Sequence, residues 1–328
     1  MSRSTVKIGD LEAAPGTKVS GYLPIADLNG YGLQMPLMIV NGAKDGPTLV
    51  LTAGTHAAEY VPIETVSRLC ANLDPKQISG CVLLVPCINV PEFQARTAFV
   101  SPIDGRNMGD SIPGDPEGSI SFRIGNVLWT QVVSKADCVI EFHGGDLTEE
   151  NIDFIIVRDT GDPKIDKVQL DVARAFNTPY LWHQAAIPTG DLKSAAGGLI
   201  GTAARKGIPG MIPESGYSGR AQESSVKMMY DGTFNVMRYL KMLEGEPTWI
   251  DQKYFKAQHF VRVKHAGLYT PTGKVGDIVQ KGDVVGVVKN IFGEVLEELK
   301  SPVYGILDFH EFSPTVMPSN TTWIIGEL

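Results

Sequence analysis

Apolar positions follow two different spacings along the first 250 residues of the chain. Short apolar runs typical of strands cover residues 18–25, 33–40, 48–53, 82–88, 138–142, 152–157, 180–182 and 210–213. Between them, apolar residues recur every three to four positions over 60–73, 119–134, 164–176, 192–206 and 222–243. Strands that alternate with helices predict an α/β fold, with a sheet covered by helices on both faces.

The pattern changes near residue 250. From residue 254 onward, helical periodicity is nearly absent, and short strand-like runs are separated by turn residues such as Gly276-Asp277 and Gly282-Asp283. This pattern is typical of a small all-β domain of about 70 residues. We therefore predict two domains, residues 1–250 and residues 251–328.

Composition and charge exclude several classes of protein. The net charge is −8 and no Lys/Arg cluster stands out, so we expect no nucleic-acid partner. No apolar stretch has the length of a membrane span, and the N-terminus does not resemble a signal peptide, so we expect no membrane association. The cysteines lack a CxxC spacing, which predicts free thiols and a cytoplasmic protein: Cys70, Cys81, Cys87 and Cys138.

Four residues with catalytic potential follow three of the predicted strands. His56 and Glu59 are three positions apart after the strand 48–53, and His143 follows the strand 138–142. Two imidazoles and a carboxylate form a common ligand set for catalytic zinc. Glu214, at the end of the strand 210–213, is a candidate general base. The spacing alone leaves a metal site and an ordinary structural role for these residues both open.

Several motifs in the same order resemble the succinylglutamate desuccinylase/aspartoacylase family, a short branch of the zinc carboxypeptidase-like fold. They are GTHAAE (54–59), INVPEFQAR (88–96), SPIDGRNMGDSIPGDPEGS (101–119), EFHGG (141–145) and GIPGMIPESG (207–216). The C-terminal segment also resembles the β-barrel-like tail of bacterial family members. The resemblance implies a mixed sheet, with residues 1–250 as the catalytic domain.

The resemblance also implies roles for individual residues. It implies one zinc ion per chain, held by His56, Glu59 and His143, with Glu214 as the base. Arg96 would polarise the scissile carbonyl and stabilise the oxyanion. For Arg96, the alternative is a surface salt bridge.

One motif departs from the family pattern. The family usually reads D-G-x-N-L-N-R-x-F-P-G, and its Asn-Arg pair grips the substrate carboxylate, whereas this chain has Gly109-Asp110 at that place. Asp repels a carboxylate that Arg would bind. Either Arg106 reaches into the pocket in its place, or Asp110 faces a cationic substrate such as an N-acetyl diamino acid. Asn107 and Tyr217 complete the predicted substrate contacts.

We therefore expect a zinc-dependent hydrolase that cleaves the amide bond of a small N-acyl amino acid or N-acyl diamino acid. The alternatives are a zinc carboxypeptidase acting on peptides, against which Gly109-Asp110 argues, and a non-catalytic ligand-binding member of the fold. Cobalt or manganese could also fill such a site. The sequence leaves open whether the chain forms a homo-oligomer, and whether the tail closes over the active site or mediates assembly.

Overall fold

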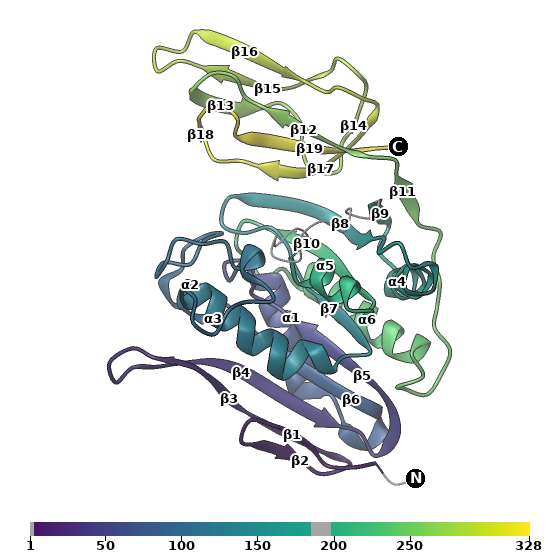
Figure 1. Cartoon of the computed structure of the whole chain (residues 1–328). Helices are drawn as coiled ribbons and strands as arrows, with labels where there is room; N and C mark the ends of the chain where they lie inside the picture. Colours follow the sequence, from purple (N-terminus) through teal and green to yellow (C-terminus); the bar gives the residue numbers. More distant parts are fainter. Residues whose placement is uncertain (1–2, 185–197) are drawn as a thin grey trace.

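The computed structural model describes residues 3–184 and 198–328. Within these residues, a 13-stranded mixed sheet extends from the N-terminal half into the C-terminal tail (Figure 1). Its main strand order is β12-β19-β17-β8-β10-β7-β5-β6-β4-β3. The predicted α/β class with an additional all-β region is confirmed.

The N-terminal part of the sheet contains the strands predicted over 18–25, 33–40 and 48–53. They are β3 (Thr17–Asp27), β4 (Gly32–Asn41) and β5 (Lys44–Thr52), beside a small separate sheet of β1 (Val6–Ile8) and β2 (Leu11–Ala13). The third of these strands begins earlier than predicted. β5 already begins at Lys44, which pairs with Ser79, and a register irregularity between Lys44 and Thr48 accommodates the intervening Gly-Pro pair.

Strand direction reverses near the middle of the sheet. β6 (Ser79–Val85) and β7 (Cys138–Glu141) flank β5 in parallel, and β10 (Gly210–Tyr217) pairs in parallel with β7. β8 (Glu149–Arg158) is antiparallel to β10, and β9 (Tyr180–Gln184) pairs with its far edge. The carboxyl ends of β5, β7 and β10 therefore meet at one edge, where ligands bind in open α/β sheets.

Helices cover both faces of the sheet because successive apolar residues of a strand point to opposite faces, and both faces must be buried. Leu49 and Leu51 of β5 pack in one core, and Val50 between them packs in another. The first core includes α1 (Tyr60–Asn72), α4 (Pro163–Phe176) and α6 (Glu223–Tyr239), and the second includes α3 (Ile120–Val127) and α5 (Gly198–Arg205) (Figure 1).

Two predicted helices differ from the structure. The helix expected over 119–134 is α3 alone, because a π-helical turn (Leu128–Val132) and a 3-10 turn (Val133–Lys135) follow it. Of the helix expected over 192–206, residues 192–197 lie outside the described residues, and α5 occupies 198–205 of the remainder. Of the helices in the described residues, none has both the length and the apolar character needed to cross a membrane.

The tail is all β with a core of its own, which includes Val285, Val288 and Trp323. Its strands are β11 (Lys253–Phe255), β12 (Gln258–Arg262), β13 (Gly267–Pro271), β14 (Ile278–Val279), β15 (Val284–Lys289), β16 (Val295–Lys300), β17 (Gly305–Glu311), β18 (Thr315–Val316) and β19 (Thr321–Glu327). The tail also continues the main sheet, because β17 pairs with β8 and β11 pairs with β9.

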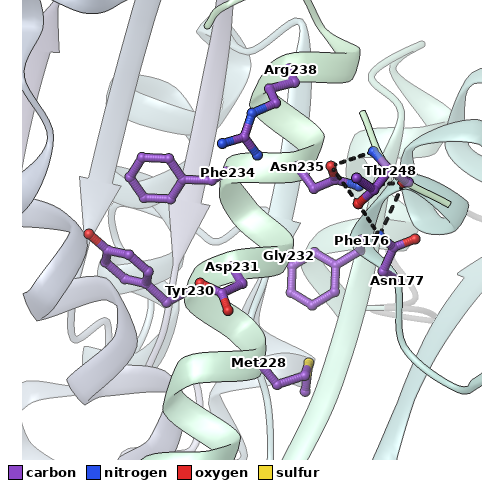
Figure 2. Close-up of a pocket in the computed structure, with 10 residues that line it drawn as sticks. All are labelled: Phe176, Asn177, Met228, Tyr230, Asp231, Gly232, Phe234, Asn235, Arg238 and Thr248. Carbon is purple, nitrogen blue, oxygen red and sulfur yellow. Dashed lines mark hydrogen bonds between the residues drawn. The ribbon is translucent and has the colours of Figure 1, made fainter. Parts of the chain in front are cut away.

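The segment that leads into the tail is fastened to the helical layer. Figure 2 shows the pocket where this happens, with Asn235 of α6 and Asn177 both directed at Thr248. Asn235 Nδ2 donates to the carbonyl of Thr248 at 2.7 Å, and Asn235 Oδ1 accepts from the Thr248 N–H at 2.8 Å. Asn177 Nδ2 donates to the same carbonyl at 3.1 Å. These hydrogen bonds at Thr248 thus fix the path of the chain between α6 and the tail.

Candidate metal centre and active site

Three neighbouring strands bring four of the predicted residues to one edge of the sheet. His56 and Glu59 lie between β5 and α1, and His143 follows β7. Glu214 belongs to β10, and an isolated β-bridge joins its backbone to that of His143. Residues that are 158 positions apart in the sequence, from His56 to Glu214, are therefore held by a single stretch of sheet.

Gly144 allows the strand ends to approach this closely. A Cβ atom at Gly144 would lie 2.0 Å from the carbonyl oxygen of Ser215, a distance that real side chains do not tolerate. The N–H of Gly144 also donates to Oε2 of Glu59 at 3.2 Å. A glycine after His143 is thus required for the strand contact, and its backbone N–H also helps to position Glu59.

His56, Glu59 and His143 form a cluster whose potential ligand atoms all lie within 4.8 Å of one another. His56 Nδ1 is 2.7 Å from Glu59 Oε1, and His143 Nδ1 is 3.1 Å from Glu59 Oε2. The Glu59 side chain is buried, and the two imidazoles are partly exposed.

The other nitrogen of each imidazole is held by an oxygen acceptor. His56 Nε2 lies 3.1 Å from Asn107 Oδ1, which also accepts the N–H of Gly109 at 2.7 Å. His143 Nε2 lies 3.2 Å from the carboxylate of Glu141. Both of these acceptors require a proton on Nε2, so in the neutral form of either imidazole Nδ1 carries the lone pair.

This arrangement fits a divalent cation. When both imidazoles are neutral, their Nδ1 lone pairs point at the oxygens of the Glu59 carboxylate. These electron-rich atoms repel one another unless a cation or protons lie between them. Two histidines and one carboxylate are also the ligand set of several catalytic zinc sites. The contacts of His56 with Asn107 and of His143 with Glu141 are those that orient zinc-binding imidazoles in proteins.

The electrostatics of the cluster support the same conclusion. Burial raises the pKa of Glu59, but His143 and His56 lower it by a larger amount, so that the pKa is about 2. Burial lowers the pKa of His143, yet Glu59 and Glu141 raise it well above the usual value. The carboxylate thus attracts positive charge strongly, and metal binding would displace the protons of the imidazoles.

Glu214 has the properties of a proton-transfer group. Its burial raises its pKa to about 8, His143 opposes this effect, and Glu59 adds to it. Asn151 of β8 donates from Nδ2 to Oε2 of Glu214 at 3.2 Å. A carboxyl group with a raised pKa, fixed beside a candidate metal site, is suited to general acid–base catalysis near neutral pH.

A pocket of about 430 Å³ adjoins the cluster. His56 and His143 line it where it meets the cluster, and the predicted substrate residues Asn107 and Asp110 also line it. Further lining comes from Thr55, Gly109, Glu141, Arg158, Gly198 and Ile212. Thr55 Oγ1 donates to Glu141 at 2.8 Å and so helps to hold the acceptor of His143 in place.

The predicted residues Arg96, Arg106 and Tyr217 are not among those that line this pocket, and neither are Glu59 and Glu214. The guanidinium of Arg106 packs over the ring of Phe122, 4.9 Å from its centroid. Arg96 follows α2 (Val90–Ala95) with a φ of 54° and an exposed side chain. Tyr217, at the end of β10, is 41% exposed.

Sequence reasoning did not identify Glu141, Asn151, Arg158 or Phe99. Glu141 could have been found, because it precedes His143 by two residues and so lies on the same side of the chain as His143. Phe99 stacks on the His56 ring with centroids 4.7 Å apart. It comes from the long loop after α2, whose path has no periodic signal.

Comparisons with known proteins identify the family of this chain. The profile of the succinylglutamate desuccinylase/aspartoacylase catalytic domain matches residues 45–240. A curated relative, the N-alpha-acetyl-L-2,4-diaminobutyric acid deacetylase of Halomonas elongata, is 30% identical over 315 residues, which cover 93% of this chain and 90% of the relative.

Solved structures show the same fold over nearly the whole chain. The ectoine utilization protein EutE (DoeB) of Ruegeria pomeroyi, bound to product, has a TM-score of 0.85 at 23% identity and covers 95% of both chains. A succinylglutamate desuccinylase/aspartoacylase from Rhodobacter sphaeroides has a TM-score of 0.84 at 24% identity, covering 94% of this chain and 95% of that one. With the profile match and the curated relative, these findings show that the chain belongs to the succinylglutamate desuccinylase/aspartoacylase family.

Proposed function

We propose that this protein is a zinc-dependent deacylase that hydrolyses the amide bond of a small N-acyl amino acid, releasing a carboxylate and an amine. The observation that carries the proposal is the orientation of His56 and His143, whose Nδ1 atoms both face Glu59 beside a pocket. Family membership and the deacetylase relative support the type of reaction.

The residues around the cluster have distinct tasks in this proposal. Zinc, when bound by His56, Glu59 and His143, would act as a Lewis acid toward the acyl carbonyl and make water more acidic. Glu214 takes a proton from the attacking water and passes it to the leaving nitrogen. Asn151 holds the Glu214 carboxyl through its 3.2 Å hydrogen bond.

Arg96 retains its proposed role as the cation that stabilises the oxyanion. Its guanidinium would have to turn toward the pocket when substrate binds, since its side chain is exposed in the structure. Replacing Arg96 by Gln would then lower kcat more than it changes zinc content.

For the substrate we favour an N-acyl diamino acid. Asp110 lines the pocket at the position where the family usually has Arg, and its carboxylate is exposed. An ammonium group on the substrate would match this charge, whereas a second carboxylate would be repelled. The Halomonas elongata relative is named for a substrate of this kind, N-alpha-acetyl-L-2,4-diaminobutyric acid.

The test combines zinc analysis with hydrolysis of a substrate panel. The panel compares N-acetyl-2,4-diaminobutyrate with N-acetyl-aspartate and N-succinyl-glutamate. We expect about one zinc per chain and the fastest turnover on the diamino acid. His56→Ala should lose zinc and turnover together, whereas Glu214→Gln should keep zinc and lose turnover by about 10²–10⁴-fold.

His265→Ala is the matched control, because His265 lies in the tail with a side chain that is 54% exposed. It should retain both zinc and turnover. Protein that binds no metal would contradict the proposal, and so would zinc-loaded protein that hydrolyses no member of the panel.

We also propose that the catalytic domain spans residues 1–250 and that residues 251–328 form a second domain in the same protein. The separate core around Val285 and Trp323 supports this boundary, although the paired strands β8 and β17 couple the two parts. A cytoplasmic location is proposed on the basis of the four free cysteines. Whether the chain forms a homo-oligomer is a matter for light scattering.

A further inference from the structure

Arg158 reaches the pocket from a part of the chain that carries none of the recognised motifs. In the antiparallel pair, Ile156 of β8 lies opposite Ile212 of β10. Arg158 has the same parity as Ile156, so it lies on the same face of the sheet as Ile212, and both Arg158 and Ile212 line the pocket. Val157, between Ile156 and Arg158, packs in the core on the other face.

The charge of Arg158 is not matched by an acid in the described part of the chain. Its Nε donates to Oε1 of Gln184 at 2.7 Å, and its Nη2 donates to the same oxygen. This neutral amide orients the guanidinium but does not neutralise it. Burial and the nearby Arg205 guanidinium both lower the pKa of Arg158, so the surroundings do not favour its positive charge. Such a site gains most from an anionic ligand.

The opposite charge, Asp110, lines the same pocket from the 3-10 turn Met108–Ser111. Its position is fixed at the start of that turn, where Asn107 Oδ1 accepts the N–H of Gly109. The pocket therefore offers a guanidinium from the sheet and a carboxylate from the loop. A small molecule that carries one free carboxylate and one free ammonium would match both.

We propose that carboxylate recognition in this protein has moved from the loop to the sheet: Arg158 binds the substrate carboxylate, and Asp110 binds the free ammonium of an N-acyl diamino acid. This inference rests on the proposed deacylase function and specifies its substrate class. It assigns the specificity of the pocket to a pair of opposite charges, and it gives Arg158 the task that Arg106 would otherwise have.

The test measures binding in the zinc-loaded Glu214→Gln protein, in which turnover is not needed. The ligands are N-acetyl-2,4-diaminobutyrate and the same compound with its carboxylate converted to a carboxamide. We expect the carboxylate to bind about 10²-fold more tightly, since a guanidinium–carboxylate pair is among the stronger hydrogen-bonded contacts. Adding Arg158→Gln should erase this preference and leave the Kd of the carboxamide nearly unchanged.

Arg106→Gln is the matched comparison, because Arg106 is the competing guanidinium and packs on Phe122. It should retain the preference for the carboxylate. The inference is overturned if Arg106→Gln erases the preference, if Arg158→Gln weakens both ligands equally, or if neither ligand binds. Zinc content and turnover of the unaltered protein report separately on the proposed function.

A second pair of ligands tests the other charge. N-acetyl-2-aminobutyrate lacks the free amine, and we expect it to bind about 10-fold more weakly than N-acetyl-2,4-diaminobutyrate, since Asp110 is exposed to solvent. Asp110→Asn should remove this difference without affecting the preference for a carboxylate, and Asp110→Arg should reverse the ranking. If the order of the two Kd values is unchanged in both variants, Asp110 does not bind the ammonium group.

Discussion

Asp308 should make the stability of this protein fall as the pH rises from 5 to 8. It lies on β17 in the tail and is fully buried. Gln258 Nε2 donates to one oxygen of its carboxylate, and the other oxygen, Oδ1, has no hydrogen-bond partner in the structure as described. Burial raises the pKa of Asp308 from 3.8 to about 7.

The direction follows from which state binds the proton more tightly. An acid whose pKa is higher in the folded state stabilises the fold fully below its unfolded pKa, and it loses this contribution as the pH rises through the folded pKa. A change from 3.8 to about 7 corresponds to about 4 kcal/mol in total. About 2 kcal/mol of this is already lost at pH 5, so the loss between pH 5 and pH 8 is roughly 2–3 kcal/mol.

Asp308→Asn removes the titration and keeps the shape of the side chain. The assay is urea unfolding of wild type and variant at pH 5, 6, 7 and 8, since urea does not screen charge. We expect the variant to gain roughly 2–3 kcal/mol relative to wild type between pH 5 and pH 8. His310, two residues away, has its pKa lowered by burial from 6.5 to about 4, so its own contribution to stability rises with pH over part of this range. Because this contribution is present in both proteins, it cancels in the difference between variant and wild type.

The exposed Asp251→Asn is the control and should give a difference that does not vary with pH. A difference between Asp308→Asn and wild type that is equally constant across the range would refute the reasoning. It would mean that water or a rearranged side chain solvates the Asp308 carboxylate in the folded state.

Two further changes test other parts of the structure. Asn235→Ala removes hydrogen bonds to Ala175 and Thr248, so we expect the free energy of unfolding in urea to fall by about 2–4 kcal/mol. A fall of less than about 0.5 kcal/mol would contradict the idea that Asn235 holds the segment that leads into the tail. Gly144→Ala places a Cβ atom 2.0 Å from the carbonyl oxygen of Ser215, so we expect the zinc content to fall several-fold while the core of the tail stays folded. Full zinc occupancy in this variant would contradict the need for a close approach between Gly144 and Ser215.

Much of the fold is visible in the sequence because the strands are short and fully apolar. The run Leu49-Val50-Leu51 predicts a buried strand, and the structure explains the run, since successive residues enter the two different cores. The end of the helix at Val127 was not visible, because the apolar spacing continues through Leu128 and Val132 into the π-helical turn. A small widening of the helix keeps these residues buried without any change in composition.

The grouping of His56, Glu59 and His143 was predictable because these residues stand next to strand ends. His56 and Glu59 are close in sequence, and His143 follows a run that could only be a strand. Arg158 was not predictable in the same way. The apolar run ends at Val157, and only the pairing of β8 with β9 places Arg158 beside Gln184, 26 residues away.

Strand β8 connects these observations. Near its start, Asn151 holds Glu214, and at its end Arg158 lines the pocket, so one strand positions both the proposed base and the guanidinium. Asn151 is also paired with Phe309 of the tail. This pairing makes the tail part of the sheet that carries Glu214. Because β17 pairs with the start of β8 at its other edge, the tail helps to determine where Glu214 sits, although His56, Glu59 and His143 all lie outside the tail.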